Sequence, residues 1–195
     1  MGRGVIGIDV GGTKVRAVMV EVATNEVVDR EASSSSDDGP TLVDTLANLV
    51  VGLGDRTGHE VAAVGLGVAG LAHRSGVVHY SPNLPGLSGF PIGPELQEAL
   101  GVPVVVGNDA TAGTFAEWQL GAGRDADNFA MVTLGTGIGT GFVVDGQLLR
   151  GASGFAGESG HMVVDVNGPA HRTGQRGPWE YFASGTALDL SLIHI

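Results

Sequence analysis

Two segments of the chain share one pattern, in which an apolar run, a turn of glycine and threonine, and a second apolar run follow one another. Residues 4–20 have the sequence GVIGIDVGGTKVRAVMV, and residues 128–144 have the sequence NFAMVTLGTGIGTGFVV. Short apolar runs bounded by glycine turns are typical of buried strands. The repeat indicates an internal duplication, and therefore two lobes with a cleft between them. The alternative is a pair of unrelated hairpins that both contain glycine.

Strand and helix patterns alternate along the rest of the chain. Strands are expected at residues 4–10, 15–20, 26–31, 61–68, 102–106, 129–134 and 141–144, and helices from residue 40, at 94–100, at 109–120 and from residue 179. Segments 33–39 and 81–91 are expected to be loops because they are rich in Ser, Asp, Gly and Pro. This alternation predicts an α/β fold with a largely parallel sheet.

The charge balance of the chain limits its partners. The 195 residues include 21 acidic and 10 basic side chains, which give a formal net charge of −11. Such a chain repels nucleic acid and anionic membranes, so we expect neither as a partner. If it binds phosphates, it must do so through backbone N–H groups and a metal ion rather than through a basic patch. The sequence contains no cysteine, which excludes disulfides and thiolate metal ligands. It shows no signal peptide and no membrane-spanning run, which predicts a cytoplasmic protein.

Glycine is in marked excess, at 34 residues, and part of it is concentrated in two candidate phosphate loops. In the first loop, Gly11, Gly12 and Thr13 offer backbone N–H groups and a hydroxyl to a phosphate, and Lys14 follows them. Asp9, at the end of the preceding strand, is placed to organise Mg²⁺. The order Thr-Lys and the strand that follows distinguish this loop from a P-loop. The alternative is a plain hairpin turn.

The second candidate loop spans residues 135–141, where four glycines alternate with other residues and Gly135, Thr136 and Gly137 come first. It is not a dinucleotide-binding motif, because the third glycine is misplaced and no helix follows. Paired with the first loop across a duplicated fold, it predicts a two-sided phosphate clamp. The alternative is a flexible hairpin.

Asn108 and Asp109 are expected at the end of a buried strand and the start of a helix, where ligand-contacting residues of α/β sheets gather. The helix dipole favours an ionised Asp109, and an ionised Asp can accept a hydroxyl proton during phosphoryl transfer. An ordinary N-cap is the alternative for Asp109. Glu158, His161 and Glu180 carry groups that can hydrogen-bond sugar hydroxyls, although a lone glutamate is often only a solvated surface residue.

Together these residues resemble the sugar kinases of the ROK family, and most closely its bacterial glucokinases. The resemblance covers residues 5–189 and rests on the motifs IGIDVGGTK, GLGVAG, SPNLPG, GNDATAG, LGTGIGTGFVVDG, GASGFAGESGHM and WEYFASG. It implies an actin-like ATPase (ribonuclease H-like) fold of two duplicated lobes, with ATP and sugar in the cleft. The lobes would span residues 1–107 and 108–189, and the second lobe would be incomplete.

The resemblance also implies roles for individual residues. Asp109 would be the catalytic base for the 6-hydroxyl of glucose. The sugar would be held by Asn83, Asn108, Asp109, Glu158, His161 and Glu180, and the ATP phosphates by Gly11, Gly12, Thr13, Lys14, Gly135, Thr136 and Gly137, with Mg²⁺ near Asp9. The expected reaction is ATP-dependent formation of glucose 6-phosphate, the first step of glycolysis, by a homodimer or a higher homo-oligomer.

One departure from the family pattern concerns zinc. The family often has a zinc site made by the histidine that matches His161 and by three cysteines in a C-x-C-G-x-x-G-C run. Residues 171–178 have the sequence HRTGQRGP instead, so that His171, Thr173 and Pro178 stand at the cysteine positions. These residues cannot complete a closed tetrahedral site of the usual nitrogen and sulfur type, and we expect no structural zinc.

Several alternatives to an ATP-dependent glucokinase stay open. The substrate could be fructose, mannose or an N-acetylhexosamine, and the phosphoryl donor could be polyphosphate. The family also includes sugar-responsive repressors, but here the first strand begins at Val5, which leaves no room for a DNA-binding helix-turn-helix. A sugar-binding regulator without catalysis is the remaining option. The last six residues, 190–195, match a translated sequencing adapter, so we expect a non-native tail there.

Overall fold

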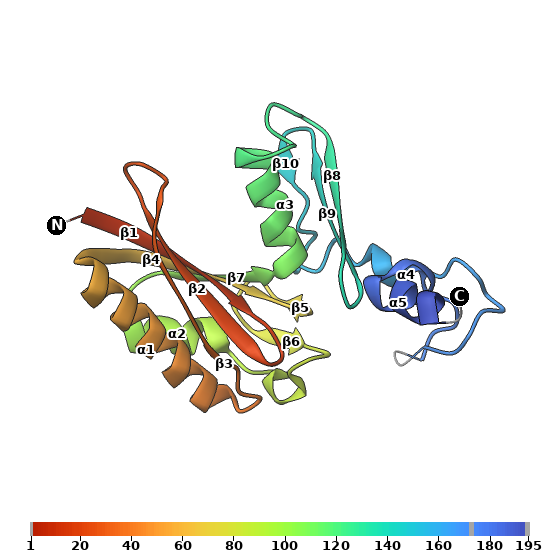
Figure 1. The fold of residues 1–195 in the computed structure, drawn as a ribbon, viewed down its shortest axis with the longest axis horizontal. Helices are drawn as coiled ribbons and strands as arrows, with labels where there is room; N and C mark the ends of the chain where they lie inside the picture. Colours follow the sequence, from red (N-terminus) through yellow and green to blue (C-terminus); the bar gives the residue numbers. More distant parts are fainter. Residues whose placement is uncertain (1, 172–173, 194–195) are drawn as a thin grey trace. The chain divides into compact units, whose positions relative to one another are not determined.

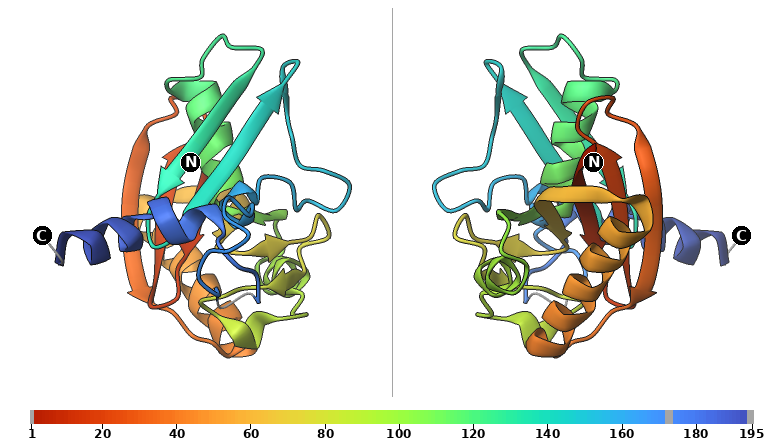
Figure 2. Two further views of the ribbon diagram at one scale, coloured as in Figure 1. Left: turned by 90° about the vertical axis from the view of Figure 1, so that its right-hand side faces the viewer. Right: turned by 90° about the vertical axis from the view of Figure 1, so that its left-hand side faces the viewer.

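The computed structural model describes residues 2–171 and 174–193. Thr173 and the last two residues of the expected tail lie outside these ranges. The chain divides into two compact units, Met1–Asp109 and Ala110–Ile195 (Figures 1 and 2). The sequence-based boundary lies two residues earlier. Asn108 and Asp109 are grouped with the first unit because Asn108 is the last residue of a strand in its sheet.

The first unit is built on a five-stranded sheet with the order β3-β2-β1-β4-β7. The strands are β1 (Gly2–Val10), β2 (Lys14–Glu21), β3 (Val27–Ser34), β4 (His59–Val68) and β7 (Val104–Asn108). The pairs β1-β2 and β2-β3 are antiparallel, whereas β1-β4 and β4-β7 are parallel. The prediction of a largely parallel sheet is therefore wrong. Tight turns join antiparallel neighbours, and parallel neighbours need the longer connections that contain helices.

Helices α1 (Gly39–Thr57) and α2 (Ile92–Leu100) belong to these longer connections and lie on one face of the sheet (Figure 1). The apolar stripe that the spacing predicts for α1 is buried, and it packs on alternate residues of the strands. The core includes Leu42, Leu46, Leu49, Val50 and Leu53 of α1, Ile6, Ile8 and Val10 of β1, and Val64, Leu66 and Val68 of β4. A two-residue period in strands and a 3.6-residue period in helices explain why the sequence predicts this layer.

The ends of α1 follow local chemistry. The side chain of Asp38 accepts a hydrogen bond of 3.0 Å from the backbone N–H of Thr41 at the first turn, which is the usual N-cap interaction. Gly58 ends the helix with φ at 66°, in the left-handed region that favours glycine. The helix therefore begins one residue before the Pro40 at which the sequence predicts its start.

Several expected boundaries in the first unit change. Strand β3 continues to Ser34, which pairs with Lys14, so the loop expected at 33–39 starts later. Strand β7 begins at Val104 rather than at residue 102, because it follows Pro103, which has no N–H to donate. A 3₁₀ turn, η1 (Pro85–Leu87), lies within the loop expected at 81–91. The short pair β5 (Leu71–Ala72) and β6 (Val78–Tyr80) has no clear sequence signal.

The second unit contains an antiparallel sheet with the order β10-β9-β8. Its strands are β8 (Phe129–Leu134), β9 (Ile138–Val144) and β10 (Gln147–Leu148). Its helices are α3 (Asp109–Leu120), η2 (Ser159–His161), α4 (Trp179–Ala183) and α5 (Gly185–Ile193). Helix α3 begins at Asp109, the last residue of the first unit. Strands β8 and β9 with their turn repeat the layout of β1 and β2. Within the described residues, no helix combines the length and the apolar character that a membrane span requires.

The glycine run at 135–141 is only partly a loop, which corrects the prediction. Strand β9 starts at Ile138, and Gly139 and Gly141 pair with Thr133 and Met131 of β8. A Cβ atom on Gly139 would lie 2.7 Å from the Cβ of Ala110, and one on Gly141 would overlap the Thr114 side chain. These two glycines therefore allow α3 to pack directly on β9, so that only Gly135 and Gly137 remain in the turn.

Candidate functional site

The carboxyl ends of three strands meet at one edge of the first sheet. Val10 of β1 pairs with Val68 of β4, and Val68 pairs with Asn108 of β7. Asp9 is the residue before Val10 on β1, and Asp109 directly follows Asn108, the last residue of β7. Ligand-binding residues of α/β sheets gather at such an edge. The fold of the first unit therefore brings two carboxylates that are far apart in the sequence to the same edge.

The first candidate phosphate loop is a tight turn at this edge. Gly11 donates its N–H to the carbonyl oxygen of Lys14 at 3.0 Å, and Thr13 accepts a hydrogen bond from Ser35 N at 3.0 Å. A Cβ atom on Gly12 would lie 2.9 Å from the Cβ of Asn83, so glycine is needed for this close approach. The loop after β6 thus places Asn83 beside the turn, and the exposed Gly12 and Thr13 leave the turn open to a ligand.

Asp9 lies opposite Arg16 in the β1-β2 register. Its Oδ2 atom is 3.5 Å from the guanidinium of Arg16, and 55% of the Asp9 side chain is exposed. An exposed carboxylate oxygen is a suitable Mg²⁺ ligand, and the ion pair is weak enough to rearrange around one. Arg16 is not among the predicted site residues, although its position opposite Asp9 follows from the register of a tight hairpin.

Asn108 and Asp109 are fixed in different ways at the end of β7. The side-chain amide of Asn108 donates a hydrogen bond of 3.2 Å to the carbonyl oxygen of Gly70. Asp109 is the first residue of α3, its side chain is exposed, and its Cα would lie 3.5 Å from a Cβ atom on Gly67. Asp109 therefore lies at the N-terminal end of α3, directly after the carboxyl end of β7.

The second candidate phosphate loop is the turn between β8 and β9. Gly135 donates its N–H to the carbonyl oxygen of Gly137 at 3.0 Å, and the carbonyl of Gly135 accepts from Gly185 N at 2.8 Å. The hydroxyl of Thr186 donates to the carbonyl oxygen of Thr136 at 3.0 Å. The start of α5 therefore holds this turn in place, with Gly135 and Thr136 exposed.

Glu158, His161 and Glu180, three of the expected sugar ligands, form one cluster in the second unit. The Nε2 atom of His161 lies 3.7 Å from Oε2 of Glu158, and its Nδ1 atom lies 3.6 Å from Oε1 of Glu180. Glu180 is buried at 9% exposure, and its Oε2 accepts a hydrogen bond of 3.4 Å from Ile138 N. The cluster therefore offers two carboxylates and an imidazole, the groups that hydrogen-bond sugar hydroxyls.

His171 joins the same cluster, although the sequence analysis treated it only as a lost zinc ligand. Its Nε2 atom lies 3.2 Å from Oε1 of Glu180. Its backbone N–H donates to the carbonyl oxygen of Gln175 at 2.8 Å. Pro178 has no donor atom for a metal, and Thr173 lies outside the described residues. The family's set of one histidine and three cysteines therefore has no equivalent here, and His161, His171 and Glu180 stand together instead.

Thr140 supports this cluster and was not predicted. Its buried hydroxyl donates a hydrogen bond to the carbonyl oxygen of Gly157 and accepts one of 3.2 Å from Ser159 N. Gly157 itself has φ at 104°, which favours glycine. Thr140 therefore ties the segment that carries Glu158 and His161 to β9, and its place between two glycines of the run 135–141 was the available signal.

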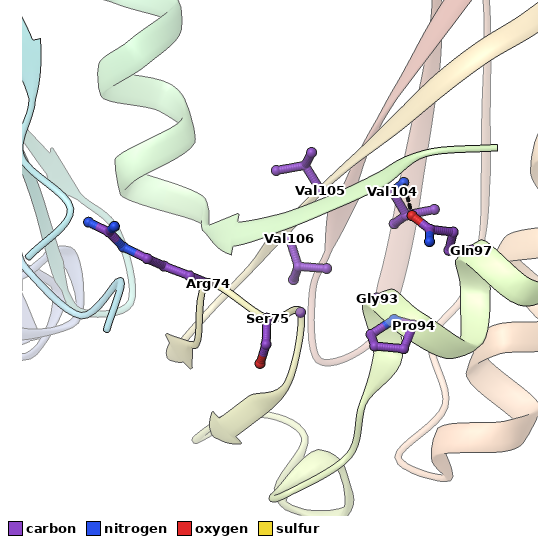
Figure 3. A pocket seen from close by; sticks show the side chains of 9 residues that line it. Arg74, Ser75, Gly93, Pro94, Gln97, Val104, Val105 and Val106 are labelled. Atoms are coloured by element: carbon purple, nitrogen blue, oxygen red, sulfur yellow. Dashed lines mark hydrogen bonds between the residues drawn. The ribbon is translucent and has the colours of Figure 1, made fainter. Parts of the chain in front are cut away.

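A pocket of about 190 Å³ opens elsewhere in the first unit, between α2 and β7 (Figure 3). Its walls include Pro94 and Gln97 of α2 and Val104 and Val106 of β7. The side chain of Gln97 accepts a hydrogen bond of 3.2 Å from Val104 N within it. None of the predicted site residues lines this pocket, so it does not account for their arrangement.

Comparison with known proteins identifies the family of the chain. Residues 5–192 match the ROK family. The chain is 37% identical over 184 residues to a glucokinase of Streptomyces coelicolor, which covers 94% of this chain and 57% of that protein. It is 33% identical over 191 residues to the xylose repressor of Bacillus subtilis, which covers 96% of this chain and 49% of the repressor. The chain thus spans about half the length of these relatives.

The structural comparison gives the same result. The crystal structure of a ROK family glucokinase from Streptomyces griseus in complex with glucose and AMPPNP aligns with a TM-score of 0.83 and 35% identity, over 95% of this chain and 58% of that one. This similarity confirms the actin-like ATPase fold that the resemblance implies, with a mixed sheet in the first unit. Since the family match extends over nearly all of its residues, the chain belongs to the ROK family.

Proposed function

We propose that the chain carries active-site residues of an ATP-dependent glucokinase, which transfers the γ-phosphoryl group of ATP to the 6-hydroxyl of glucose. The observation that carries the proposal is the exposed Asp109 carboxylate at the start of α3, next to the anchored Asn108. The 37% identity to the S. coelicolor glucokinase supports it. An ATP-dependent step of glycolysis takes place in the cytoplasm, and we propose that location.

In the proposed mechanism, Asp109 accepts the proton of the sugar hydroxyl as the phosphoryl group is transferred. The transition state of phosphoryl transfer is loose, so a weak base in the right position is sufficient. Asn108 orients the sugar next to this base, because its own amide is held by the carbonyl of Gly70. Positioning of the two reactants supplies most of the rate enhancement in such a reaction.

The phosphates of ATP are proposed to bind the two glycine turns. Gly11, Gly12 and Thr13 and, in the second unit, Gly135, Thr136 and Gly137 offer backbone N–H groups and hydroxyls. Mg²⁺ near Asp9 would neutralise phosphate charge, and Lys14 and Arg16 add positive charge next to the first turn. These contacts suit an acidic chain, because they need no basic patch.

The sugar is proposed to bind Asn83 and Asn108 of the first unit and Glu158, His161 and Glu180 of the second. The imidazole of His161 lies between the carboxylates of Glu158 and Glu180, which orient its two nitrogens. Burial of Glu180 and its bond from Ile138 N hold one carboxylate in a fixed position. Fixed donors and acceptors of this kind discriminate between hexoses at single hydroxyl groups. The proposed assembly is a homodimer or a higher homo-oligomer.

A panel of hexoses in an ATP-coupled assay tests the proposal. The panel contains glucose, fructose, mannose and N-acetylmannosamine, each with ATP or polyphosphate as donor. The assay uses the 195-residue chain and, in parallel, the same chain fused to the part of the S. coelicolor glucokinase that has no counterpart here. We expect glucose with ATP to give the highest kcat/KM. A higher kcat/KM with another hexose would make that sugar the substrate, and a higher kcat/KM with polyphosphate would make polyphosphate the phosphoryl donor.

A second candidate function is sugar-responsive regulation without catalysis, which the similarity to the B. subtilis xylose repressor supports. A regulator of this class binds its sugar but does not turn over ATP. Calorimetric titration with glucose and xylose, together with the kinase assay, separates the two functions. Sugar binding with no phosphorylation in the fused protein would favour the regulator.

A further inference from the structure

Three metal-ligating side chains gather in the second unit. His161, His171 and Glu180 each present one donor atom, and these atoms lie within 4.8 Å of one another. Among residues 2–171 and 174–193, this is the one group of three or more His, Cys, Asp or Glu side chains with that spacing. The three come from different parts of the chain: His161 from η2, Glu180 from helix α4, and His171 from the segment between them.

The measured separations fit tetrahedral coordination. Bonds of about 2.0–2.2 Å from zinc to nitrogen and oxygen imply donor atoms about 3.3–3.6 Å apart in a tetrahedral site. The Nε2 atom of His171 is 3.2 Å from Oε1 of Glu180, and the Nδ1 atom of His161 is 3.6 Å from the same oxygen. Two of the three distances between donor atoms are thus already close to the tetrahedral value. The third separation, between the donor atoms of the two histidines, is at most 4.8 Å.

The surroundings of His161 provide a second, independent observation. Its Nδ1 atom is buried and has no hydrogen-bond partner among the described residues. A buried polar atom without a partner is costly, and a cation would satisfy it. Its other ring nitrogen, Nε2, faces Glu158 at 3.7 Å. Metal-binding histidines commonly have a carboxylate near their second ring nitrogen, and Glu158 occupies that side of His161, although 3.7 Å is longer than a hydrogen bond.

A proton shared between His171 and Glu180 is a weaker explanation of the arrangement. It would account for the 3.2 Å contact, but it would leave the buried Nδ1 of His161 unsatisfied at 3.6 Å from the carboxylate. A single cation bound to Oε1 of Glu180 satisfies all three donor atoms together.

We propose that His161, His171 and Glu180 form an open, three-ligand site for a borderline divalent cation such as Zn²⁺ or Co²⁺. Two imidazoles and one carboxylate suit these ions better than Mg²⁺, which prefers oxygen ligands. Three protein ligands leave the fourth position to water or to a ligand oxygen. The donor set has no sulfur, so the site differs from a closed structural centre, and the ion exchanges with solvent.

The site has a consequence that rests on the proposed function. His161 and Glu180 are proposed sugar ligands, and a cation that holds both would compete with glucose for them. Glucose should therefore weaken cation binding, and the cation should weaken glucose binding by the same factor, since linkage is reciprocal.

Titration of the 195-residue chain with Co²⁺, followed by the visible absorption of the bound ion and by calorimetry, tests the site. We expect one Co²⁺ per chain, displaced by Zn²⁺. His171→Gln and Glu180→Gln should each weaken binding at least about tenfold, because each removes a ligand. The matched control is His59→Gln, since His59 lies 3.6 Å from Glu21 but belongs to no group of three donors. Circular dichroism confirms that each variant is folded.

Absence of stoichiometric binding, or equal Co²⁺ affinity in wild type and in the folded His171→Gln and Glu180→Gln variants, would overturn the proposed site. These titrations contain neither sugar nor ATP, so they do not depend on the proposed kinase function. Repetition with glucose then separates the two ideas. A raised apparent Kd for Co²⁺ supports the shared ligands. Binding at the three side chains with no effect of glucose keeps the cation site and contradicts the sugar role of His161 and Glu180.

Discussion

Gly12 lies so close to Asn83 that a Cβ atom on Gly12 would fall 2.9 Å from the Asn83 Cβ and 3.1 Å from the Asn83 carbonyl oxygen. Gly12 and Asn83 are 71 residues apart in the sequence, yet the turn between β1 and β2 and the loop after β6 touch at this point. The absence of a side chain at Gly12 thus brings a proposed phosphate turn and a proposed sugar ligand together.

Gly12→Ala should destabilise the first unit by about 1–3 kcal/mol, because backbone atoms must move to accept the methyl group. The matched control is Gly7→Ala in β1, where a Cβ meets nothing within 4 Å. That change should leave stability unchanged or raise it by up to about 1 kcal/mol. Urea denaturation of the two variants measures the difference. Equal free energies of unfolding would show that Asn83 moves to accept the methyl group without destabilising the fold.

Asp109→Asn should lower kcat by about 10²–10⁴-fold, because the amide cannot accept the hydroxyl proton. Glucose affinity should stay within a few-fold of wild type, since the amide keeps the shape of the carboxylate. Asp44→Asn on the exposed face of α1 is the control and should keep full activity. The coupled assay on the fused protein and glucose calorimetry measure these effects. Normal turnover of the Asp109→Asn variant would refute its role as base.

Gly137→Ala should weaken glucose binding about tenfold or more, because small displacements of positioning groups are costly. Its Cβ would fall 2.5 Å from Oε2 of Glu180 and push that carboxylate away. Gly135→Ala in the same turn is the control, since its Cβ would meet nothing within 4 Å. Calorimetry with glucose compares the two variants. An equal loss in both would mean that the turn itself, rather than Glu180, controls sugar affinity.

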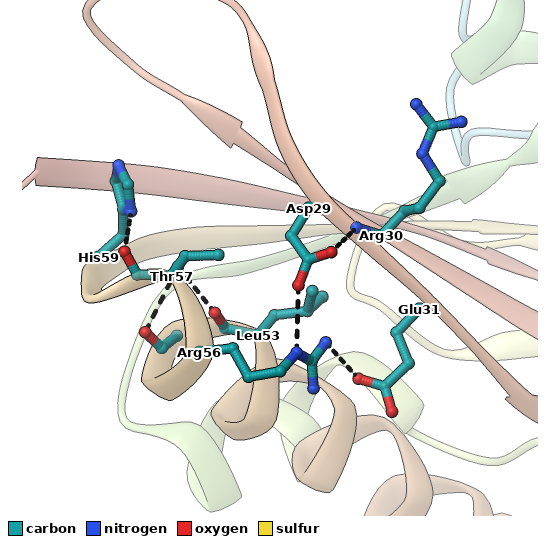
Figure 4. A network of polar contacts seen from close by, with 8 residues as sticks. Asp29, Arg30, Glu31, Leu53, Arg56, Thr57 and His59 are labelled. Atoms are coloured by element: carbon teal, nitrogen blue, oxygen red, sulfur yellow. Dashed lines mark hydrogen bonds and ion pairs between the residues drawn. The ribbon is translucent and has the colours of Figure 1, made fainter.

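Acid should remove the stabilisation from the ion pairs between α1 and β3 (Figure 4). The pKa of Asp29 is lowered below its ordinary value of 3.8, first by the hydrogen bond from the backbone N–H of Arg30 and then by the guanidinium of Arg56. The Nε atom of Arg56 lies 3.1 Å from Oδ2 of Asp29. Arg56 also binds Glu31 at 2.7 Å. A carboxylate whose pKa is lower in the folded state than in the unfolded state stabilises the fold at pH values above its unfolded-state pKa. This stabilisation is lost as the pH falls through the folded-state pKa.

The stability difference between wild type and Arg56→Gln should therefore be largest near neutral pH and shrink below about pH 4. It should be small throughout, because the groups are exposed and solvent screens them. Arg30→Gln is the control, because Arg30 contributes its backbone N–H and not its side chain. Thermal unfolding between about pH 3 and pH 7 measures the effect. A difference that grows on acidification would contradict this account.

Removal of metal ions should leave stability unchanged, because no closed structural zinc site is expected. With EDTA, the Tm should shift by less than about 1 °C, whereas zinc-dependent folds unfold under chelation. Protein prepared without added metal should carry far less than one zinc per chain by mass spectrometry. One tightly held zinc, or a large fall in Tm with EDTA, would contradict the prediction.

The sequence predicts the individual elements of this protein well, because a strand or helix depends on residues a few positions apart. Strand β1 follows from a short apolar run that ends in glycines, and the buried stripe of α1 follows from apolar residues at helical spacing. Motifs in the sequence also point to Asp9, Asp109 and the two glycine turns. Local signals were insufficient for β5 and β6, which are too short to show a period.

Tertiary structure decided the features that depend on residues far apart in the chain. It made the sheet mixed, since strand direction depends on the length and path of each connection. It showed that Gly139 and Gly141 allow α3 to approach β9, which composition alone could not distinguish from phosphate binding. It also placed His171 next to Glu180, where a residue that the sequence marks only as a lost cysteine becomes a donor beside His161. Sequence alone therefore determined most of the segments that form strands and helices, because their formation depends on near neighbours. Which side chains lie close together depends on how the whole chain packs.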